Sequence, residues 1–412
     1  MLFKKNMNWT NFLKNISLLF LSLIIALLLA EGLARLFLDD AHNSEASDNI
    51  YKFFEFDSKL GWKNKSNYSG IFKREEYEYR ISINSEGMRH KEVSKEKSKN
   101  KQRIAVMGDS FTWGVGVKDS ERFTNIVENK STENYDVLNF GVSGYGPLRY
   151  FLQLDKVLEF NPDIVFLTFC LGNDFADNVF FNRYGYYGPF TVLDNKPELE
   201  IYGYPLPEVG EFYNFTDTYI PLLSSFIEGS RLYYLSNLFY RNLNTERLEG
   251  SIYNSESSFY LYKNQRNFSQ AGHLGAKESQ RDVYVPNHSN EAKLFAQDMA
   301  AVNKKILSKI NDRLKAKNIN FAVIVAPTKC DYGQCFQDFP QDMDGTMNNN
   351  ARNLLIDDLN DLGIDYIDPS DSMSLDDFYT IDSHWLASGH KTIANHVLKW
   401  LSNNTVIKKK NK

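Results

Sequence analysis

The chain has 412 residues and a formal net charge of −5 at neutral pH, with 47 Lys and Arg against 52 Asp and Glu. A chain of this length can bury a large core, as one big domain or as two ordinary ones. Basic residues form no block before the last few positions, which argues against nucleic acid as a partner. We interpret the basic tail, residues 403–412, as a solvated chain end.

Residues 1–40 predict where the protein is located. Three lysines precede a hydrophobic stretch, Ile16–Leu38, that is long enough to span a bilayer. We expect a single-pass transmembrane anchor, because no good small-residue cleavage site supports a removed signal peptide. A soluble amphipathic helix fits poorly, since Leu18–Ala30 is apolar on all sides. The positive-inside rule then places most of the chain in the periplasm or outside the cell, because the lysines precede the stretch and acidic residues follow it.

Residues 41–100 read as a polar N-terminal extension. The pattern of Tyr77–Ile83 predicts a strand or a hairpin, and Asn84–Gly87 supplies turn residues. The charged run Lys91–Lys101 is typical of a solvated linker.

From residue 101 to residue 402 strands and helices alternate, which predicts a parallel sheet with helices on both faces. The expected strands are Arg103–Met107, Tyr135–Phe140, Ile164–Cys170, Asn320–Pro327 and Ile364–Ile367. The expected helices are Arg122–Asn129, Pro147–Phe160, Glu291–Lys317, Asn349–Leu362 and Ser388–Leu401.

The alternation is interrupted at about 179–290 by a stretch with no clear period and many aromatic residues. A bare loop of this length is unusual in a compact domain, so we expect an insertion with short helices, such as Tyr219–Leu238. Its aromatic rings suit the walls of a groove for sugars or for a long acyl chain. The rings considered for this role are those of Tyr184, Tyr186, Tyr187, Tyr202 and Tyr204.

Three cysteines provide no disulfide framework. Cys170 lies in an apolar run and is expected to be an inert buried thiol. Cys330 and Cys335 share one loop, and whether they form a bridge stays open. No second cysteine pair is available for a zinc site, and we expect no metal and no organic cofactor.

Residues suited to acyl transfer follow each of the first three strands. Ser110 comes directly after the first strand, Gly144 follows the second and Asn173 follows the third. Asp382 and His384 stand in the loop before the last helix. The C-terminal ends of parallel strands meet at one crevice, so these residues are expected to converge.

The residue types predict a nucleophilic serine. A serine hydroxyl attacks an ester only when a histidine takes its proton, and a carboxylate must orient that histidine. We therefore assign Ser110, His384 and Asp382 as the catalytic triad, with the oxyanion bound by the N–H of Ser110, the N–H of Gly144 and the Asn173 amide. The alternative for Ser110 is a helix N-cap. His390 and His396, on the last helix, are interpreted as structural.

Four blocks of the sequence resemble the GDSL or SGNH hydrolase family. They are Gly108–Phe111, Asn139–Gly144, Gly172–Asp174 and the pair Asp382 and His384. The aspartate and the histidine stand two positions apart, where many members have three. This spacing, and the segment Ala326–Lys329, resemble the membrane-linked branch that includes alginate-type polysaccharide O-acetyltransferases. The chain lacks the G-x-S-x-G elbow of the α/β-hydrolases, because Thr112 stands two positions after Ser110.

The resemblance covers about 101–178 and 291–402 and implies a flavodoxin-like three-layer α/β/α sandwich. It also implies ester hydrolysis or acyl transfer without metal or organic cofactor. We expect a membrane-anchored serine esterase or O-acyltransferase that acts on acyl esters, acetyl first, of cell-envelope or exported glycans. A lipase or thioesterase is the alternative activity, and a non-catalytic glycan-binding protein of the same fold is the alternative from another class. Acyl length, acceptor and oligomeric state stay open.

Overall fold

The computed structural model describes residues 51–175, 177–178, 290–332 and 346–404, with shorter stretches between 14 and 32 and between 182 and 206. The chain divides into two units, of which the first comprises Met1–Ser44 and Gly210–Tyr253. The described residues of this first unit are helical. Among the described residues, no helix has both the length and the apolar character needed to cross a membrane. The anchor expected at Ile16–Leu38 is described only in part and stays a prediction.

The second unit is built around a five-stranded parallel sheet with the order β11-β10-β7-β5-β6. The strands are β5 (Gln102–Met107), β6 (Tyr135–Asn139), β7 (Ile164–Cys170), β10 (Asn320–Ala326) and β11 (Asp365–Ile367). Numbered along the chain, these five strands have the order 2-1-3-4-5 of flavodoxin-like sheets. The expected α/β fold with a parallel sheet is confirmed.

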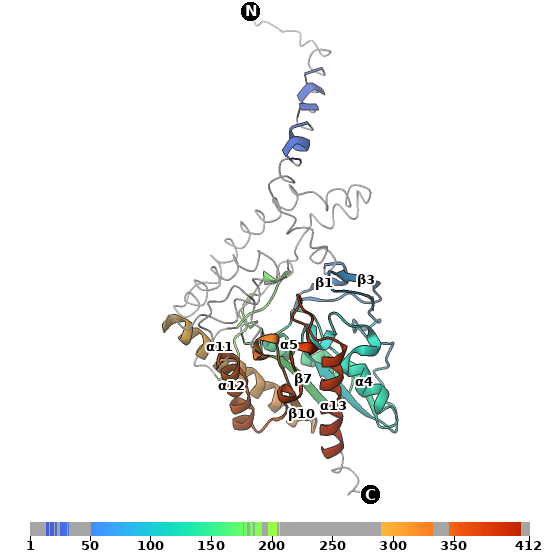
Figure 1. Cartoon of the computed structure of the whole chain (residues 1–412), viewed down its shortest axis with the longest axis vertical. Coiled ribbons are helices and arrows are strands. Elements are labelled where there is room, and N and C mark those ends of the chain that lie inside the picture. Colours follow the sequence, from blue (N-terminus) through green and yellow to red (C-terminus); the bar gives the residue numbers. More distant parts are fainter. Residues whose placement is uncertain are drawn as a thin grey trace, which may run out of the picture. The chain divides into compact units, whose positions relative to one another are not determined.

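Helices cover both faces of the sheet (Figure 1). On one side α4 packs on α13, and on the other α11 packs on α5 and α12. Their bounds are α4 (Phe123–Lys130), α5 (Pro147–Leu158), α11 (Asn290–Lys315), α12 (Thr346–Leu362) and α13 (Ala387–Asn404). Short elements are α3 (Ser110–Trp113), η2 (Tyr51–Phe53), η3 (Asp119–Glu121), η5 (Lys329–Tyr332), η6 (Ser370–Ser372) and η7 (Leu375–Asp377). All seven residues of β7 are buried, as its unbroken apolar run predicts for a central parallel strand.

The N-terminal extension forms two antiparallel hairpins. The first joins β1 (Phe54–Asp57) to β2 (Gly61–Asn64), and the second joins β3 (Ser69–Arg74) to β4 (Tyr77–Ser82). Both hairpins pack against the sheet domain. The Trp62 indole, on β2, donates to the carbonyl of Ser143, and the Tyr79 ring, on β4, lies 6.5 Å from that of Trp113. Phe53, in η2 just before the first hairpin, also stacks on Trp113. The run Lys91–Lys101, expected as a solvated linker, also contacts the sheet domain, since Lys95 forms an ion pair with Glu159 and Lys97 with Asp163.

The expected insertion lies largely outside the described residues, including the helix expected at Tyr219–Leu238. Its described part contains the short strands β8 (Asn182–Arg183) and β9 (Tyr186–Tyr187). The ring centroid of Tyr186 lies 6.4 Å from that of Trp62, and Tyr202 stacks on Phe190. The structure describes no side-chain position for Tyr184, Tyr187 or Tyr204.

Two buried histidines make the fold sensitive to acid. His90 and His390 are 5% and 1% exposed. Burial, followed by the charge of Arg122, lowers the pKa of each imidazole to about 3, with smaller contributions from Lys91 at His90 and Arg89 at His390. The folded state therefore resists a proton that the unfolded state binds near pH 6.5. Stability is full above that pH and is lost as the pH falls toward 3.

We expect the free energy of unfolding to fall by about 1.4 kcal/mol per pH unit for each of these histidines as the pH drops below 6.5. Urea titrations at pH 7, 6 and 5 measure the slope. His90→Leu should reduce the slope by one histidine's share, because it removes a single titrating group. Asn395→Gln, at an exposed position on the same helix as His390, removes no titrating group and should leave the slope unchanged. A His90→Leu slope equal to that of the wild type would contradict the expectation.

Candidate active site

The serine of the first block lies at the sheet edge where β5 ends. Asp109 is the N-cap of α3, and its side chain accepts a 2.9 Å hydrogen bond from the N–H of Phe111. Ser110 is the first residue of α3, so the alternative that Ser110 itself caps the helix is wrong. Gly108 has φ +154°, and a Cβ at this position would overlap the Thr112 side chain. The Gly-Asp-Ser order thus follows from a tight strand-to-helix turn that holds the Ser110 hydroxyl at its tip.

The three residues expected to form the triad meet. The Nε2 atom of His384 lies 2.7 Å from the Oγ atom of Ser110. On the other side of the ring, Nδ1 contacts the Oδ1 atom of Asp382, which also accepts a 3.0 Å bond from the backbone N–H of His384. The spacing of two positions between Asp382 and His384 is therefore compatible with a complete set of Ser-His-Asp contacts.

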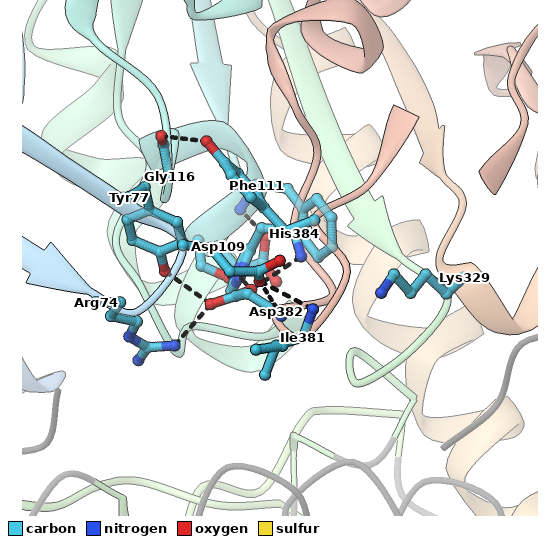
Figure 2. Close-up of polar contacts among 12 residues, drawn as sticks. Arg74, Tyr77, Asp109, Phe111, Gly116, Lys329, Ile381, Asp382 and His384 are labelled. Carbon is cyan, nitrogen blue, oxygen red and sulfur yellow. Dashed lines mark hydrogen bonds and ion pairs between the residues drawn. The ribbon is translucent and has the colours of Figure 1, made fainter. Parts of the chain in front are cut away.

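The second oxygen of Asp382 is bound by residues of the N-terminal extension. Arg74 Nη1 and the Tyr77 hydroxyl each donate to Oδ2 at 2.7 Å, reaching Asp382 from the side away from His384 (Figure 2). Burial alone would raise the pKa of Asp382. The charge and hydrogen bond of His384, then the charge of Arg74 and the bond from Tyr77, outweigh it and hold this pKa well below its usual range. Asp382 is therefore an anion at neutral pH.

The imidazole of His384 is also held by packing. Its ring centroid lies 4.9 Å from that of Phe111, the residue after Ser110. The neighbouring Trp385 is fully buried, and its indole N–H donates to the carbonyl of Pro327 at the end of β10. The loop that contains Asp382 and His384 is thereby attached to the sheet domain immediately after the histidine.

The second block holds α3, the helix that begins at Ser110, in place. Asn139, the last residue of β6, donates from its amide to the carbonyl of Thr112 at 2.7 Å and accepts from the N–H of Gly141 at 2.9 Å. A Cβ on Gly141 would overlap the backbone nitrogen of Trp113 and lie 2.7 Å from the carbonyl carbon of Thr112. Gly141 is therefore needed for a close backbone approach rather than for a turn.

We expect Gly141→Ala to lower kcat by about 10²-fold, because the added methyl pushes α3 and displaces the Ser110 hydroxyl. KM and kcat for a chromogenic acetyl ester measure the effect. Gly363→Ala is the control, since Gly363 has φ +59° far along the chain and no atom within 4 Å of its added Cβ. Gly363→Ala strains the backbone without meeting a neighbour, so it should lower stability and keep kcat. A Gly141→Ala enzyme with wild-type kcat would contradict this account.

The oxyanion-hole assignment of Ser110, Gly144 and Asn173 stays a prediction. Gly144 adopts φ +79° in the loop after β6, which favours glycine. The Asn173 amide lies at the end of β7 and donates to Asp177 Oδ2 at 2.5 Å. To bind an oxyanion, the Asn173 amide would have to give up its hydrogen bond to Asp177. Nearby, burial and then the charges of Asp109 and Asp177 raise the pKa of Asp174 well above its usual value.

Sequence patterns did not indicate that Arg74 and Tyr77 belong to the site, because residues 41–100 lie outside the four blocks. Lys329, in the segment Ala326–Lys329, lies beside the same loop and donates to the carbonyl of Thr380 at 2.6 Å (Figure 2). Burial lowers the pKa of Lys329. No signal in the sequence of the extension could have indicated that its hairpin reaches a loop about 300 positions later.

The other expectations for single residues have mixed outcomes. Cys170 is buried, and burial raises the pKa of its thiol well above the usual value, which confirms an inert thiol. His390 accepts a bond from the N–H of Phe123, and His396 contacts Ser372, in line with structural roles. The possible bridge between Cys330 and Cys335 lies outside the described residues. Within the described part of the chain, no group of three or more His, Cys, Asp or Glu residues is placed to hold a metal.

Comparisons with known proteins return matches only among solved structures. No family model and no curated protein matches the chain. Similar solved structures include TesA, with TM-score 0.35 and 9% identity over 73% of this chain and 99% of that chain. The acetyl xylan esterase AlAXEase has TM-score 0.36 and 12% identity over 73% of this chain and 99% of its own.

A putative lipolytic protein of the G-D-S-L family from Desulfitobacterium hafniense has TM-score 0.32 and 10% identity over 72% of this chain and 98% of its own. At this level of similarity the matches carry no argument about what this chain binds or converts. The strand order, and the contacts among Ser110, His384 and Asp382, are those that the resemblance to SGNH hydrolases implies.

Proposed function

We propose that this chain is a serine esterase or O-acyltransferase with Ser110, His384 and Asp382 as its catalytic triad. One observation carries the proposal: His384 contacts Asp382 through Nδ1 while its Nε2 lies 2.7 Å from the Ser110 oxygen. An Asp382 carboxylate at Nδ1 selects the tautomer with the proton on that nitrogen, so Nε2 is the base.

The arrangement supports a two-step acyl transfer. The Ser110 oxygen attacks the ester carbonyl while His384 Nε2 takes the hydroxyl proton, and the resulting imidazolium is stabilised by Asp382. The C–O bond to the alcohol then breaks, and the imidazolium protonates the leaving alkoxide. Water or a sugar hydroxyl, deprotonated by His384, attacks the acyl-serine and releases Ser110. Ser110, Gly144 and Asn173 are the proposed donors to the oxyanion.

The proposed substrate is an acyl ester, acetyl first, of a cell-envelope or exported glycan. Support comes from the N-terminal stretch, whose described helical residues Leu27, Leu28 and Leu29 are 53%, 59% and 63% exposed. Such a surface suits insertion into lipid, so we propose a single-pass anchor with the catalytic unit in the periplasm or outside the cell. An anchored enzyme there is kept close to glycans of the envelope.

The test uses the full chain in detergent and a series of p-nitrophenyl esters from acetate to octanoate, with and without an oligosaccharide acceptor. We expect hydrolysis to be fastest with acetate, and a phosphonofluoridate to label Ser110 as identified by mass spectrometry. Acetyl oligosaccharide formed in place of free acetate would indicate the transferase. Rates that rise with chain length would favour the lipase or thioesterase alternative. A chain that neither hydrolyses any ester nor takes the label would support the non-catalytic binding protein.

A further inference from the structure

The turn of the β3–β4 hairpin reaches the loop of residues 380–384, which contains Asp382 and His384 and is called the catalytic loop below. The carboxylate of Glu76, in this turn, accepts hydrogen bonds from three successive backbone N–H groups. The donors are Thr380 at 2.7 Å, Ile381 at 2.9 Å and Asp382 at 2.6 Å. The last of them is the backbone of the triad aspartate itself.

Three consecutive N–H groups that face one point form a concave anion-binding site of the backbone. Hydrogen bonds to a charged acceptor are shorter and stronger than neutral ones. Glu76 therefore fixes the path of residues 380–382, because any rotation of that backbone breaks several such bonds together. A loop with a free backbone would lack this restraint.

The flanking residues of the same turn hold the Asp382 side chain. Arg74 ends β3 and Tyr77 begins β4, where the two are cross-strand partners. Both donate to Oδ2, so Oδ1 is left to His384. Burial and the Asp382 charge raise the pKa of Tyr77, which keeps its hydroxyl a donor. The Asp382 side chain is 8% exposed, so little water competes for these bonds.

The hairpin also contacts the loop that follows the nucleophile. The Tyr79 hydroxyl, on β4, accepts from the N–H of Gly116 at 3.2 Å. Tyr379, whose ring lies 4.8 Å from Tyr77, donates to the carbonyl of Gly116 at 2.6 Å. One hairpin thus touches both segments that contribute to the triad.

We propose that Arg74, Glu76 and Tyr77 are positioning residues that hold Asp382 and its backbone in the geometry that His384 requires. This role rests on the proposed function, because it acts on the same triad. It makes the N-terminal extension part of the catalytic apparatus rather than a separate segment.

The experiment compares Glu76→Gln with Glu75→Gln in the full chain. Both changes remove one carboxylate from the same turn, but Glu75 is exposed and only Glu76 bonds the catalytic loop. In Glu76→Gln, one of the two acceptor oxygens becomes an NH₂ group and the negative charge is lost, so at least one of the backbone N–H groups faces a donor instead of an acceptor. We expect kcat for acetyl-ester hydrolysis to fall by about 10²-fold with KM changed less than about twofold, as for an interaction that orients catalytic groups. The rate of Ser110 phosphonylation should fall in parallel, since it depends on the triad and not on ester binding.

A rescue separates positioning from a general effect on folding. Glu76→Ala leaves the backbone site empty, and formate added at constant ionic strength should restore part of kcat where chloride does not. Tyr77→Phe, which removes only a hydroxyl, tests the side-chain contact if Glu76→Ala fails to fold, and thermal melting accompanies each variant. We expect Tyr77→Phe to lower kcat at an almost unchanged melting temperature.

Wild-type kcat and phosphonylation rates in Glu76→Gln and Tyr77→Phe, in a protein where Ser110→Ala is inactive, would overturn the positioning role and leave the proposed function intact. A wild-type chain that neither hydrolyses ester nor takes the phosphonyl label would overturn the proposed function, and the positioning role with it. The two failures are therefore distinguishable.

Discussion

Replacing Ser110 by alanine is expected to lower kcat for acetyl esters by about 10⁶-fold, the scale on which loss of a triad serine acts. The change removes the only oxygen that the Nε2 atom of His384 contacts in the triad, so no acyl-serine can form. The methyl of alanine leaves the turn around Gly108 and the Asp109 cap untouched. The melting temperature should therefore stay close to that of the wild type.

Steady-state hydrolysis and phosphonofluoridate labelling measure this effect. Ser120→Ala is the matched control, because Ser120 is an exposed serine ten positions further along the chain. It should keep the wild-type rate and the label. Equal rates for the wild type and Ser110→Ala would mean that the ester turnover does not come from this site, and would favour the non-catalytic alternative.

Asp382→Asn is expected to lower kcat by about 10⁴-fold while the protein stays folded. The reason lies in the two donors on Oδ2, Arg74 and Tyr77. They will hold the amide oxygen of the asparagine toward themselves, so its NH₂ group faces His384 Nδ1. That nitrogen must then accept a hydrogen bond, which moves the imidazole proton to Nε2 and leaves no base at Ser110.

Kinetics of hydrolysis across pH 6–9 check the prediction, with Asp376→Asn as the control. Asp376 is an exposed aspartate six positions before Asp382. Its replacement should leave kcat unchanged. An Asp382→Asn enzyme within tenfold of the wild type would contradict the assigned tautomer and require another source for the base.

Local patterns in the sequence were sufficient to predict the parallel sheet of the second unit. Apolar runs without a break, such as Ile164–Cys170, predict buried parallel strands because both faces of such strands are covered. Parallel strands end at one edge, so residues that follow them must converge whatever lies between. This is why Ser110 and the Asp382–His384 pair could be brought together from positions more than 270 apart.

The extension shows where such patterns stop being informative. Tyr77–Ile83 predicts a strand, and β4 is found there, but no periodicity indicates what the turn of a hairpin will touch. Glu76 looks like any solvated turn glutamate until its carboxylate is placed against residues 380–382. Asn173 is a second example. The sequence predicts that its amide binds an oxyanion, whereas in the structure this amide donates to the carboxylate of Asp177.

Residue patterns alone were enough to predict the parallel strands and the meeting of Ser110, His384 and Asp382 at one edge of the sheet, because apolar runs and the position of residues at strand ends depend on local chemistry. The folded chain was needed to show that Arg74, Glu76 and Tyr77 complete the surroundings of Asp382, and that Asp109 rather than Ser110 caps α3. The contacts to Asp382 join segments about 300 positions apart. Such hydrogen bonds depend on which groups lie close together in the folded chain, and the spacing of residues along the sequence does not give that distance.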